Sequence, residues 1–257
     1  MKRDYETLPV HLAENQRPQD DEYYRRLNDY YAVSPGSNVD KLRAFPKFVP
    51  VAELGRFLAK SRIFERVLQV PGSIVECGVY GGGGLMTWAA LSAILEPLNH
   101  VRRVIGFDTF EGFVGTSAVD ASRATNPHAS AGALAANSAA DIGESAAIFD
   151  LYRPLGHIPK VELVKGVALQ TIPEYLEHNA HLVVSLLYLD FDLYEPTRCA
   201  IERFVPRMPK GAVIAFDELN HRAWPGETMA LVDTLGIRSL KLERFPFQPQ
   251  ISFACLE

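Results

Sequence analysis

The sequence has few of the features that mark secreted, membrane or nucleic-acid-binding proteins. Three cysteines in 257 residues are an odd number that forms no disulfide framework, so we expect reduced thiols and a cytoplasmic protein. No apolar run approaches the roughly 18 residues of a membrane span, and the polar N-terminus is not followed by the apolar core of a signal peptide. A formal net charge of −5 leaves no basic surplus to neutralise phosphates, which argues against a nucleic-acid partner.

The most informative stretch is residues 73–84. A short apolar run there leads through Glu76 to Gly78 and then to four consecutive glycines, and a helical pattern follows at once. Strand, glycine loop and helix in this order are typical of a nucleotide-binding α/β unit. The spacing does not fit the dinucleotide fingerprint, which needs Gly-x-Gly-x-x-Gly and a later acid. Glu76-x-Gly78-x-x-x-Gly82 instead favours S-adenosylmethionine (SAM), with Glu76 binding the amino group of its methionine part.

A second apolar strand, at residues 102–108, ends in Asp108. A carboxylate at this position can accept both ribose hydroxyls of an adenosine. The glycine loop, the inner glutamate and this aspartate together indicate a nucleoside-type cofactor, whereas a glycine loop alone would more often be a plain turn.

Alternating apolar runs and helical patterns predict an α/β fold with a mostly parallel sheet and helices on both faces. We expect strands at residues 73–79, 102–108, 161–164, 182–189 and 212–216, and a final antiparallel hairpin of residues 239–245 and 250–255. We expect helices at residues 83–95, 141–151, 172–179 (with Pro173 in its first turn), 195–205 and 228–235, preceded by two short helices within residues 48–70.

Two segments do not fit this alternation. Residues 1–47 are polar and rich in tyrosine and arginine, and we interpret them as an N-terminal arm or lid on a domain of residues 48–257. The tyrosines could dock on the core or on a partner subunit, which hints at a homo-oligomer, although the first 20 residues are equally consistent with a frayed tail. Residues 111–140 are rich in alanine and serine without periodicity, as in a functional loop or lid.

Carboxylates follow two of the predicted strands. Asp190 and Asp192 come after residues 182–189, and Asp217 and Glu218 come after residues 212–216. Ligands of parallel sheets bind at these strand ends, and converging carboxylates repel one another unless a cation joins them. Oxygen ligands favour Mg²⁺ or Ca²⁺, so we expect a metal held by Asp190, Asp217 and Glu218. Asp192 either joins them or caps the next helix, and capping is the alternative for the whole set.

A metal at this place could bind two neighbouring hydroxyls of a substrate and lower the pKa of the attacking one. His221 follows Glu218 by three residues and is a candidate base, although an isolated histidine more often has no role. The neighbouring Tyr188 is expected in the core.

These motifs resemble the macrocin O-methyltransferase family. The similar segments are residues 76–82, 107–113 and 189–195, then Asp217-Glu218 with Trp224-Pro225-Gly226. Across residues 48–235 the resemblance implies a class I methyltransferase with a Rossmann-like fold. It further implies SAM- and Mg²⁺-dependent methylation of a sugar hydroxyl in natural-product (antibiotic) biosynthesis.

The resemblance also implies roles for single residues. Asp190 would assist deprotonation of the acceptor, and Asp190, Asp217 and Glu218 would hold the metal. The cofactor would contact Glu76, Gly78, Val79, Tyr80, Gly82, Asp108, Thr109, Phe110, the adenine-contacting segment Asp141-Ile142, and Asp190. Two departures from the family pattern are Phe191, where glycine is usual, and Glu218, where the family has aspartate.

Within that family the chain resembles enzymes that methylate nucleotide-linked rhamnose, which implies a TDP-linked deoxysugar as acceptor, or else a finished glycoside. Two other functions stay open. A catechol-type methyltransferase would use the same metal chemistry, but residues 111–140 offer few aromatic side chains for stacking. A non-catalytic SAM-binding protein would result if Glu218 had disabled the metal site, and Mg²⁺-dependent turnover would exclude it.

Overall fold

The computed structural model describes residues 18–121 and 131–257. The chain divides into two compact units, residues 1–54 and 55–257. The described part of the first unit is helical, and its last helix continues into the second unit. These helices are α1 (Pro18–Val33), α2 (Asn38–Arg43), the 3-10 helix η2 (Phe45–Lys47) and α3 (Val51–Val67).

Aromatic side chains of the first unit pack on one another. The rings of Tyr30 and Phe48 are stacked with centroids 5.6 Å apart, and Tyr31 meets Phe48 edge-on at 5.1 Å. The Lys41 ammonium donates a hydrogen bond to the carbonyl oxygen of Tyr31 at 2.6 Å and lies 4.8 Å from the centroid of that ring. Two of the tyrosines expected to dock elsewhere therefore have partners within their own unit. Most of the segment interpreted as a possible frayed tail lies outside the described residues.

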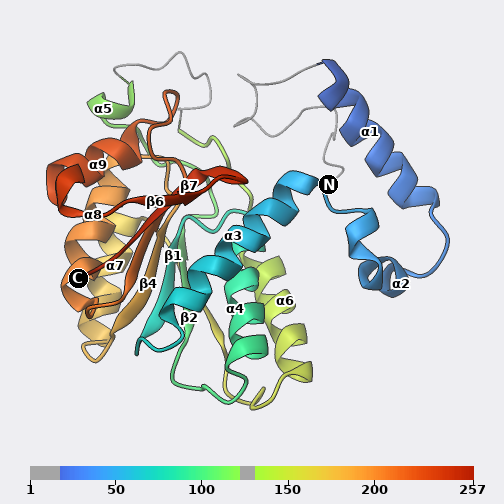
Figure 1. Cartoon of the computed structure of the whole chain (residues 1–257), viewed down its shortest axis with the longest axis horizontal. Coiled ribbons are helices and arrows are strands. Elements are labelled where there is room, and N and C mark those ends of the chain that lie inside the picture. Colours follow the sequence, from blue (N-terminus) through green and yellow to red (C-terminus); the bar gives the residue numbers. More distant parts are fainter. Residues whose placement is uncertain (1–17, 122–130) are drawn as a thin grey trace. The chain divides into compact units, whose positions relative to one another are not determined.

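The second unit contains a seven-stranded sheet with the order β3-β2-β1-β4-β5-β7-β6 (Figure 1). β1 to β5 are parallel, and β7 runs antiparallel between β5 and β6. The predicted parallel sheet and C-terminal hairpin are confirmed. The strands are β1 (Ser73–Cys77), β2 (Val104–Asp108), β3 (Val161–Lys165), β4 (Val184–Leu189), β5 (Val213–Phe216), β6 (Glu243–Phe245) and β7 (Gln248–Cys255).

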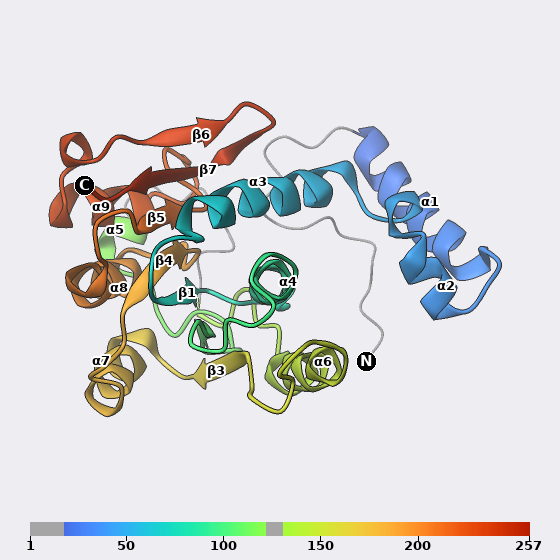
Figure 2. The same ribbon diagram turned by 60° about the horizontal axis from the view of Figure 1, so that its bottom comes forward.

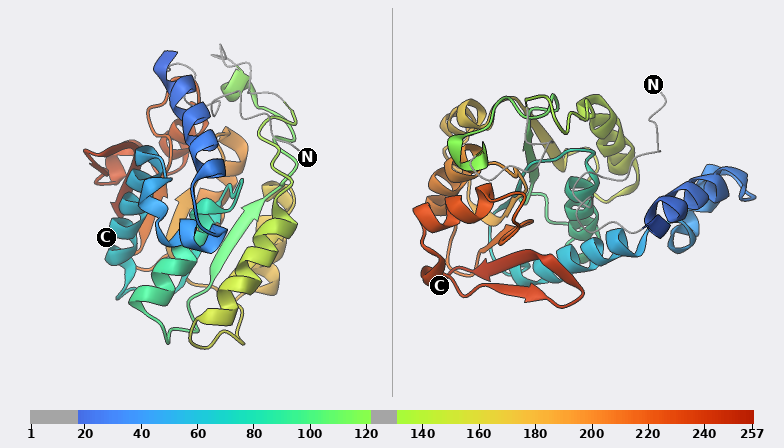
Figure 3. Two further views of the ribbon diagram at one scale, coloured as in Figure 1. Left: turned by 90° about the vertical axis from the view of Figure 1, so that its right-hand side faces the viewer. Right: turned by 90° about the horizontal axis from the view of Figure 1, so that it is seen from above.

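Helices cover both faces of this sheet, and Figures 2 and 3 let the reader follow α4 and α6 on one face and α7 and α8 on the other. One buried cluster joins α3, α4 and α6 to the sheet, and a second joins α7, α8 and α9 to its opposite face. The helices are α4 (Gly83–Leu95), α5 (Ala118–Ala121), α6 (Ala139–Tyr152), α7 (Ala168–His178), α8 (Tyr194–Phe204) and α9 (Gly226–Thr234), with 3-10 helices η3 (Val205–Arg207) and η4 (Ile237–Ser239).

The alternation of side chains along the central strands produces the two clusters. In β4, Leu186 and Tyr188 belong to the α3–α4 side, whereas Leu187 and Leu189 belong to the α7–α8 side. Successive residues of a strand point to opposite faces, so a strand buried on both faces is apolar throughout. This is why residues 182–189 form the most apolar run of the sequence.

Two helix predictions were wrong in detail. Residues 48–70 were expected to form two short helices, but Val51–Val67 is one continuous helix because its apolar residues keep a single helical period. Pro173 was expected in the first turn of its helix, yet α7 begins five residues earlier at Ala168. A proline inside a helix has no amide hydrogen to donate, so one backbone hydrogen bond of α7 is missing.

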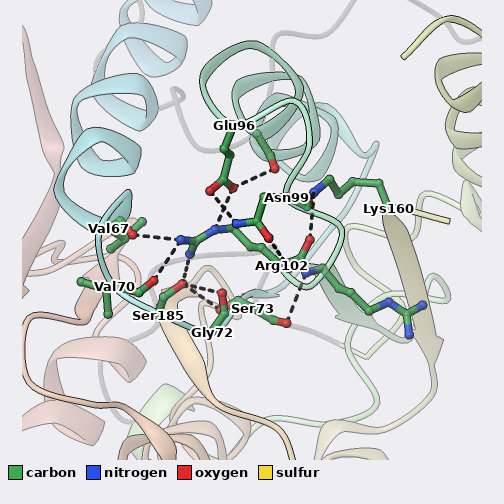
Figure 4. A network of polar contacts seen from close by, with 11 residues as sticks. Val67, Val70, Gly72, Ser73, Glu96, Asn99, Arg102, Lys160 and Ser185 are labelled. Carbon is green, nitrogen blue, oxygen red and sulfur yellow. Dashed lines mark hydrogen bonds and ion pairs between the residues drawn. The ribbon is translucent and has the colours of Figure 1, made fainter. Parts of the chain in front are cut away.

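A network around Arg102 closes the N-terminal edge of the sheet (Figure 4). The buried guanidinium lies 2.7 Å from Oε1 of Glu96 and donates hydrogen bonds to the carbonyl oxygens of Val67 (3.0 Å) and Val70 (2.9 Å). It also donates to the hydroxyl of Ser185 at the start of β4. The network therefore joins the end of α3 to β4 and to the turn before β2.

Lys160, just before β3, extends the network. Its ammonium donates hydrogen bonds to the carbonyl oxygens of Asn99 (2.6 Å) and Arg102 (2.9 Å). Burial lowers the pKa of Lys160 to about 8, since a charged ammonium loses its hydration there.

The small number of cysteines and the lack of long apolar runs led to expectations about thiols and about membrane spans. Cys77, Cys199 and Cys255 are all free thiols, as expected. Within residues 18–121 and 131–257, no helix has both the length and the apolar character needed to cross a membrane.

Candidate active site

Asp108, at the end of β2, organises the glycine loop that follows β1. Its Oδ2 accepts hydrogen bonds from the backbone amides of Val79 (2.7 Å) and Tyr80 (2.8 Å), and its Oδ1 accepts one from the amide of Phe110 (2.7 Å). Tyr80 and Phe110 have φ values of +50° and +57°, which non-glycine residues rarely adopt. The residue predicted to bind ribose therefore holds the loop. A carboxylate has about four acceptor positions, so capacity for a ligand remains.

Two glycines of the loop allow other parts of the chain to approach. Gly78 has φ +93°, and a Cβ atom there would collide with the carbonyl oxygen of Asp190. Gly82 has φ +81°, and a Cβ there would lie 2.6 Å from Cγ1 of Ile142. In the structure the glycines therefore bring the ends of β1 and β4 together and let α6 cover the loop.

The predicted adenine segment lies at the start of α6. Ile142 is buried against Gly82, while the side chain of Asp141 is exposed. The hydroxyl of Ser138, just before α6, donates a hydrogen bond to the carbonyl oxygen of Tyr80 and ties the helix to the loop.

Thr109 and Phe110, two predicted cofactor contacts after β2, have side chains that contact other parts of the protein. The Thr109 hydroxyl donates to the carbonyl oxygen of Gly112 at 2.7 Å, and the ring of Phe110 lies in the core on the α3–α4 side. The side chains of these two predicted contacts thus shape the turn after β2, and their backbone remains beside Asp108.

Glu76, the fourth residue of β1, forms a buried ion pair that the sequence did not reveal. Its Oε1 lies 2.8 Å from the ammonium of Lys60 on α3, and both side chains are almost fully buried. Oε2 of Glu76 is buried and has no hydrogen-bond partner. Burial raises the pKa of Glu76, and the nearby Lys60 opposes this shift.

The predicted acids do come together beside this loop. The amide of Asp190 donates to the carbonyl oxygen of Cys77 at 2.7 Å, and the amide of Asp217 donates to that of Leu189 at 2.9 Å. These bonds place the ends of β1, β4 and β5 at one level. The carboxylate of Asp217 already has two partners, since Arg56 of α3 forms an ion pair with Oδ2 and the hydroxyl of Tyr188 donates to Oδ1.

Burial and mutual repulsion raise the pKa of several carboxyls in this cluster. The pKa of Asp190 lies well above its usual range because of burial and the charge of Asp217, although Arg56 opposes the shift. The pKa of Asp192 also lies well above its usual range, through burial and the charge of Glu218. Burial and Asp217 raise the pKa of Glu218 to about 7. Negative charge at this edge is therefore poorly compensated.

Glu227, in the first turn of α9, is a fifth carboxyl of this cluster, in addition to Asp190, Asp192, Asp217 and Glu218. The sequence did not indicate it. It is fully buried, and its Oε2 accepts a hydrogen bond from the backbone amide of Glu218 at 3.1 Å. Its Oε1 has no partner, nor has Oε2 of Glu218. Burial, together with the charges of Asp190 and Asp217, raises the pKa of Glu227 well above its usual range.

The side chains are close without forming a ready metal centre. Among the residues that the structure describes, no group of three or more histidine, cysteine, aspartate or glutamate side chains is arranged to hold a metal ion. His221, the candidate base, is half-buried three residues after Glu218, and its Nδ1 is buried without a hydrogen-bond partner. The metal set and the base stay predictions.

Part of the segment predicted as a lid is attached to the domain. Asp120 of α5 accepts hydrogen bonds from the backbone amides of Ser117 (2.8 Å) and of Tyr194 (3.0 Å), the first residue of α8. The ring of Phe113 meets that of Trp224 edge-on with centroids 5.8 Å apart. Residues 122–130 of this predicted lid lie outside the described part of the chain.

The polar side chains of the candidate site that the sequence did not indicate are Arg56 and Lys60 of α3, Glu227 of α9, and the hydroxyl of Tyr188. A signal for the first two existed. Lys60 stands between Ala59 and Ile63 on the apolar side of the helical pattern, and Arg56 lies one turn before it. A lysine on an apolar face needs a buried anion, and Glu76 was available.

Comparisons with known proteins agree with the resemblance to a methyltransferase family. The model of the family described as macrocin-O-methyltransferase (TylF) matches residues 57–233, well over half of the chain. A curated relative from Streptomyces olivaceus, 8-demethyl-8-(2,3-dimethoxy-α-L-rhamnosyl)-tetracenomycin-C 4′-O-methyltransferase, is 31% identical over 152 residues. That match covers 58% of this chain, and the chain spans about half the length of the relative, 53%.

Two solved structures are similar over nearly the whole chain. The calicheamicin methyltransferase CalS11 is 34% identical with a TM-score of 0.89, covering 93% of both chains. An apo structure of CalS11, named there as a TDP-rhamnose 3′-O-methyltransferase, gives 32% identity and a TM-score of 0.81, covering 93% of this chain and 95% of the other. The O-methyltransferase NovP, at 22% identity and a TM-score of 0.61 over 79% of both chains, shares the fold.

The matched segment thus includes the glycine loop tied to Asp108, the acids at the ends of β4 and β5, and the five parallel strands β1 to β5. The resemblance inferred from the motifs is confirmed, and so is the class I methyltransferase fold. The chain belongs to the macrocin O-methyltransferase family.

Proposed function

We propose that this protein is a SAM-dependent and Mg²⁺-dependent O-methyltransferase that methylates a sugar hydroxyl in natural-product (antibiotic) biosynthesis. The observation that carries the proposal is the excess of carboxyls beside the glycine loop, with Asp190 and Asp192 half-buried at the end of β4 and Asp217 and Glu218 buried at the end of β5. Such an excess is costly for folding, and a cation-assisted reaction gives it a purpose.

The residues around the glycine loop fit SAM, whose sulfonium supplies an activated methyl group. Oε2 of Glu76 is a buried acceptor without a donor, which suits an ammonium group. Asp108 keeps free acceptor positions for ribose hydroxyls, and the start of α6, where Ile142 packs against Gly82, closes the loop beside the proposed adenine position. Val79 and Tyr80 would contribute backbone to this cradle.

The carboxylate oxygens at this site fit Mg²⁺ in atom type and in charge. Their present arrangement is not that of a metal centre. Asp190, Asp217 and Glu218 offer only oxygen ligands, as a hard cation requires, and Oε2 of Glu218 has no other partner. When bound, the metal would supply charge that stabilises a deprotonated sugar oxygen. Arg56 now neutralises part of the charge of Asp217.

The chain's own residues would remove the proton of the acceptor hydroxyl. Asp190 is the first candidate, because its backbone lies against Gly78 of the glycine loop and its strand end adjoins that of Asp217. His221 is the second candidate, because its Nδ1 lacks a partner. Close alignment of acceptor oxygen and methyl group would supply much of the acceleration.

The acceptor class follows from the relatives. One is named for a rhamnosyl group on tetracenomycin C and another for TDP-rhamnose, so both names contain rhamnose. We propose rhamnose or a similar deoxysugar, in its TDP-linked form, with a finished rhamnoside as the alternative.

The assembly and location form a separate part of the proposal. Free thiols at all three cysteines support a reducing, cytoplasmic location. A homo-oligomer is proposed from the aromatic N-terminal segment, and light scattering on the purified protein would test it.

The first experiment is release of S-adenosylhomocysteine (SAH) from SAM with a panel of TDP-sugars, rhamnosides and a catechol, with EDTA and with Mg²⁺ added back. We expect turnover on TDP-rhamnose that EDTA abolishes and Mg²⁺ restores. Metal-dependent turnover on a rhamnoside alone would move the acceptor to the glycoside. Turnover on the catechol alone would overturn the sugar assignment, and EDTA-insensitive turnover would overturn the role of the metal.

A further inference from the structure

Lys60 is a buried lysine whose charge is held in one place. Its Nζ lies 2.8 Å from Oε1 of Glu76, 4.0 Å from the ring centroid of Tyr188 and 5.0 Å from that of Trp88. Only 5% of the residue is exposed. A buried ammonium is tolerated where an anion pairs with it, and the two ring faces add cation–π attraction. The pair of Lys60 and Glu76 is therefore well defined in position.

The start of α4 makes room for this pair. Gly84 is the second residue of that helix, and a Cβ there would collide with both Oε1 of Glu76 and Nζ of Lys60. The glycine run thus has a second use besides the turn, since it admits an ion pair beside the first turn of α4 and next to the glycine loop.

The pair satisfies only one oxygen of the carboxylate. Oε2 of Glu76 is buried and unpartnered, although native proteins seldom leave such an atom without a donor. Around Glu76, Lys60 and Arg56 favour its ionised form, while burial and Asp217 oppose it, and the hydroxyl of Tyr188 is directed to Asp217. The arrangement lacks one cationic donor.

Resting on the proposed function, we propose that Lys60 is a positioning residue for the cofactor, which keeps Glu76 ionised and leaves Oε2 for the ammonium of the methionine part of SAM. Lys60 acts through Glu76 and needs no contact with the cofactor. A purely structural role for the pair would instead affect every ligand of the loop to the same degree.

The test compares two ligands by isothermal titration calorimetry. SAH carries the amino-acid part, whereas 5′-methylthioadenosine keeps the adenosine and the sulfur but lacks that part. We expect Lys60→Met to weaken SAH binding on the order of 10- to 100-fold, as for a lost charge-assisted hydrogen bond, and to leave methylthioadenosine binding unchanged. Lys60→Arg keeps the charge and should retain most of the SAH affinity.

The pH dependence gives a readout that a structural role would not change. Without Lys60 the pKa of Glu76 should rise further, because the charge that opposes the effect of burial is removed. SAH affinity of Lys60→Met should then recover as the pH is raised, shifted to higher pH than in the wild type. Methylthioadenosine affinity should not follow this shift.

Two further variants complete the design. Lys160→Met removes another buried lysine, at the opposite edge of the sheet, and should alter neither affinity. Glu76→Gln combined with Lys60→Met should lose little more SAH affinity than Glu76→Gln alone, because both changes remove the same contact.

Equal losses for SAH and methylthioadenosine in Lys60→Met, or fully additive losses in the double variant, would overturn the role of Lys60, while SAH binding by the wild type would leave the SAM site of the proposed function in place. Failure of the wild type to bind SAH would overturn both.

Discussion

The central sheet buries charge in opposite ways at its N-terminal edge, where the parallel strands begin, and at its C-terminal edge, where they end. At the N-terminal edge, Arg102 faces a single carboxylate, Glu96, and donates its remaining hydrogen bonds to carbonyl oxygens and a hydroxyl (Figure 4). At the C-terminal edge, two cations of α3, Arg56 and Lys60, stand among several carboxyls. The acids there are Glu76, Asp190, Asp192, Asp217, Glu218 and Glu227.

Among the residues that the structure describes, eight buried side-chain polar atoms have no hydrogen-bond partner; four of them lie at the C-terminal edge, and two, Nε of Arg102 and Nε of Arg103, lie at the N-terminal edge. At the C-terminal edge these atoms are Oε2 of Glu76, Oε2 of Glu218, Oε1 of Glu227 and Nδ1 of His221. A buried polar atom without a partner lowers stability, so a chain keeps such atoms where they serve a ligand or a reaction. The network at the N-terminal edge supports the fold, and the unpaired carboxyls at the C-terminal edge are consistent with the proposed active site there.

The largest effect should come from Asp190→Asn, which tests the reactive edge. Loss of a general base typically lowers kcat by about 10²- to 10⁴-fold. Because the amide removes a buried negative charge from a repulsive cluster, thermal stability should stay equal or increase. SAH release and a melting curve measure the two quantities. Near-normal kcat would exclude Asp190 as the base and direct attention to His221.

Arg102→Met removes the central ion pair of the N-terminal edge. Removing one partner of a buried ion pair should lower the free energy of unfolding by about 3–5 kcal/mol, because Glu96 loses its cationic partner and keeps only the hydrogen bonds from Ser92 and Asn99. Arg103 offers a matched control, since its ion pair with Glu162 at 3.1 Å is more exposed, with 42% and 30% of the two side chains accessible. Arg103→Met should cost about 0–1 kcal/mol. Urea denaturation measures both, and equal costs would contradict the contrast.

Mg²⁺ should stabilise the wild type through the carboxyls of the C-terminal edge. A ligand present at 100 times its dissociation constant adds about 2.7 kcal/mol to the free energy of unfolding. Glu218→Gln removes one proposed ligand and should reduce this gain, whereas Arg103→Met should keep it. Melting curves with Mg²⁺ and with EDTA provide the measurement, and a wild type indifferent to both would count against the metal.

The smallest effect concerns the pH dependence of Lys160. Its pKa is about 8 in the folded state and near 10.5 when the chain unfolds, so the unfolded state binds more protons between these values. Stability of the wild type should therefore gain from a rise in pH through this window. Lys160→Met lacks this contribution, and the stability difference between the two proteins should change in favour of the wild type. A constant difference would show that Lys160 does not titrate there.

Much of the fold could be read from local patterns. Glu76-x-Gly78-x-x-x-Gly82, the apolar run of residues 182–189 and the acids after it predicted the sheet, the loop and the clustering of Asp190 with Asp217. The prediction for α7 began four residues too late, at residue 172, because the first turn of that helix carries the exposed Leu169 and Gln170. Helix ends depend on capping and burial more than on periodicity.

The residues of the candidate site divide in the same way. Each acid at a strand end was visible because strand ends share one edge of a parallel sheet. For Arg56 and Lys60 the sequence carried only the signal of a lysine on an apolar helix face, and their partners were not visible because these pairs form only when α3 packs against the sheet. Phe110 carried a predicted cofactor contact, yet its ring fills the core.

The strand–loop–helix order, the position of the acids and, through the motifs, the family can be inferred from the order of residues alone. These features depend on short-range spacing and on the periodicity of apolar residues, which the chain carries locally. The pairing of charges, in contrast, follows from the packing of distant segments. This packing pairs Lys60 with Glu76 and Arg56 with Asp217, and it leaves four polar atoms of the C-terminal edge without partners. Such pairing depends on distances between segments far apart in the chain, and packing alone sets those distances.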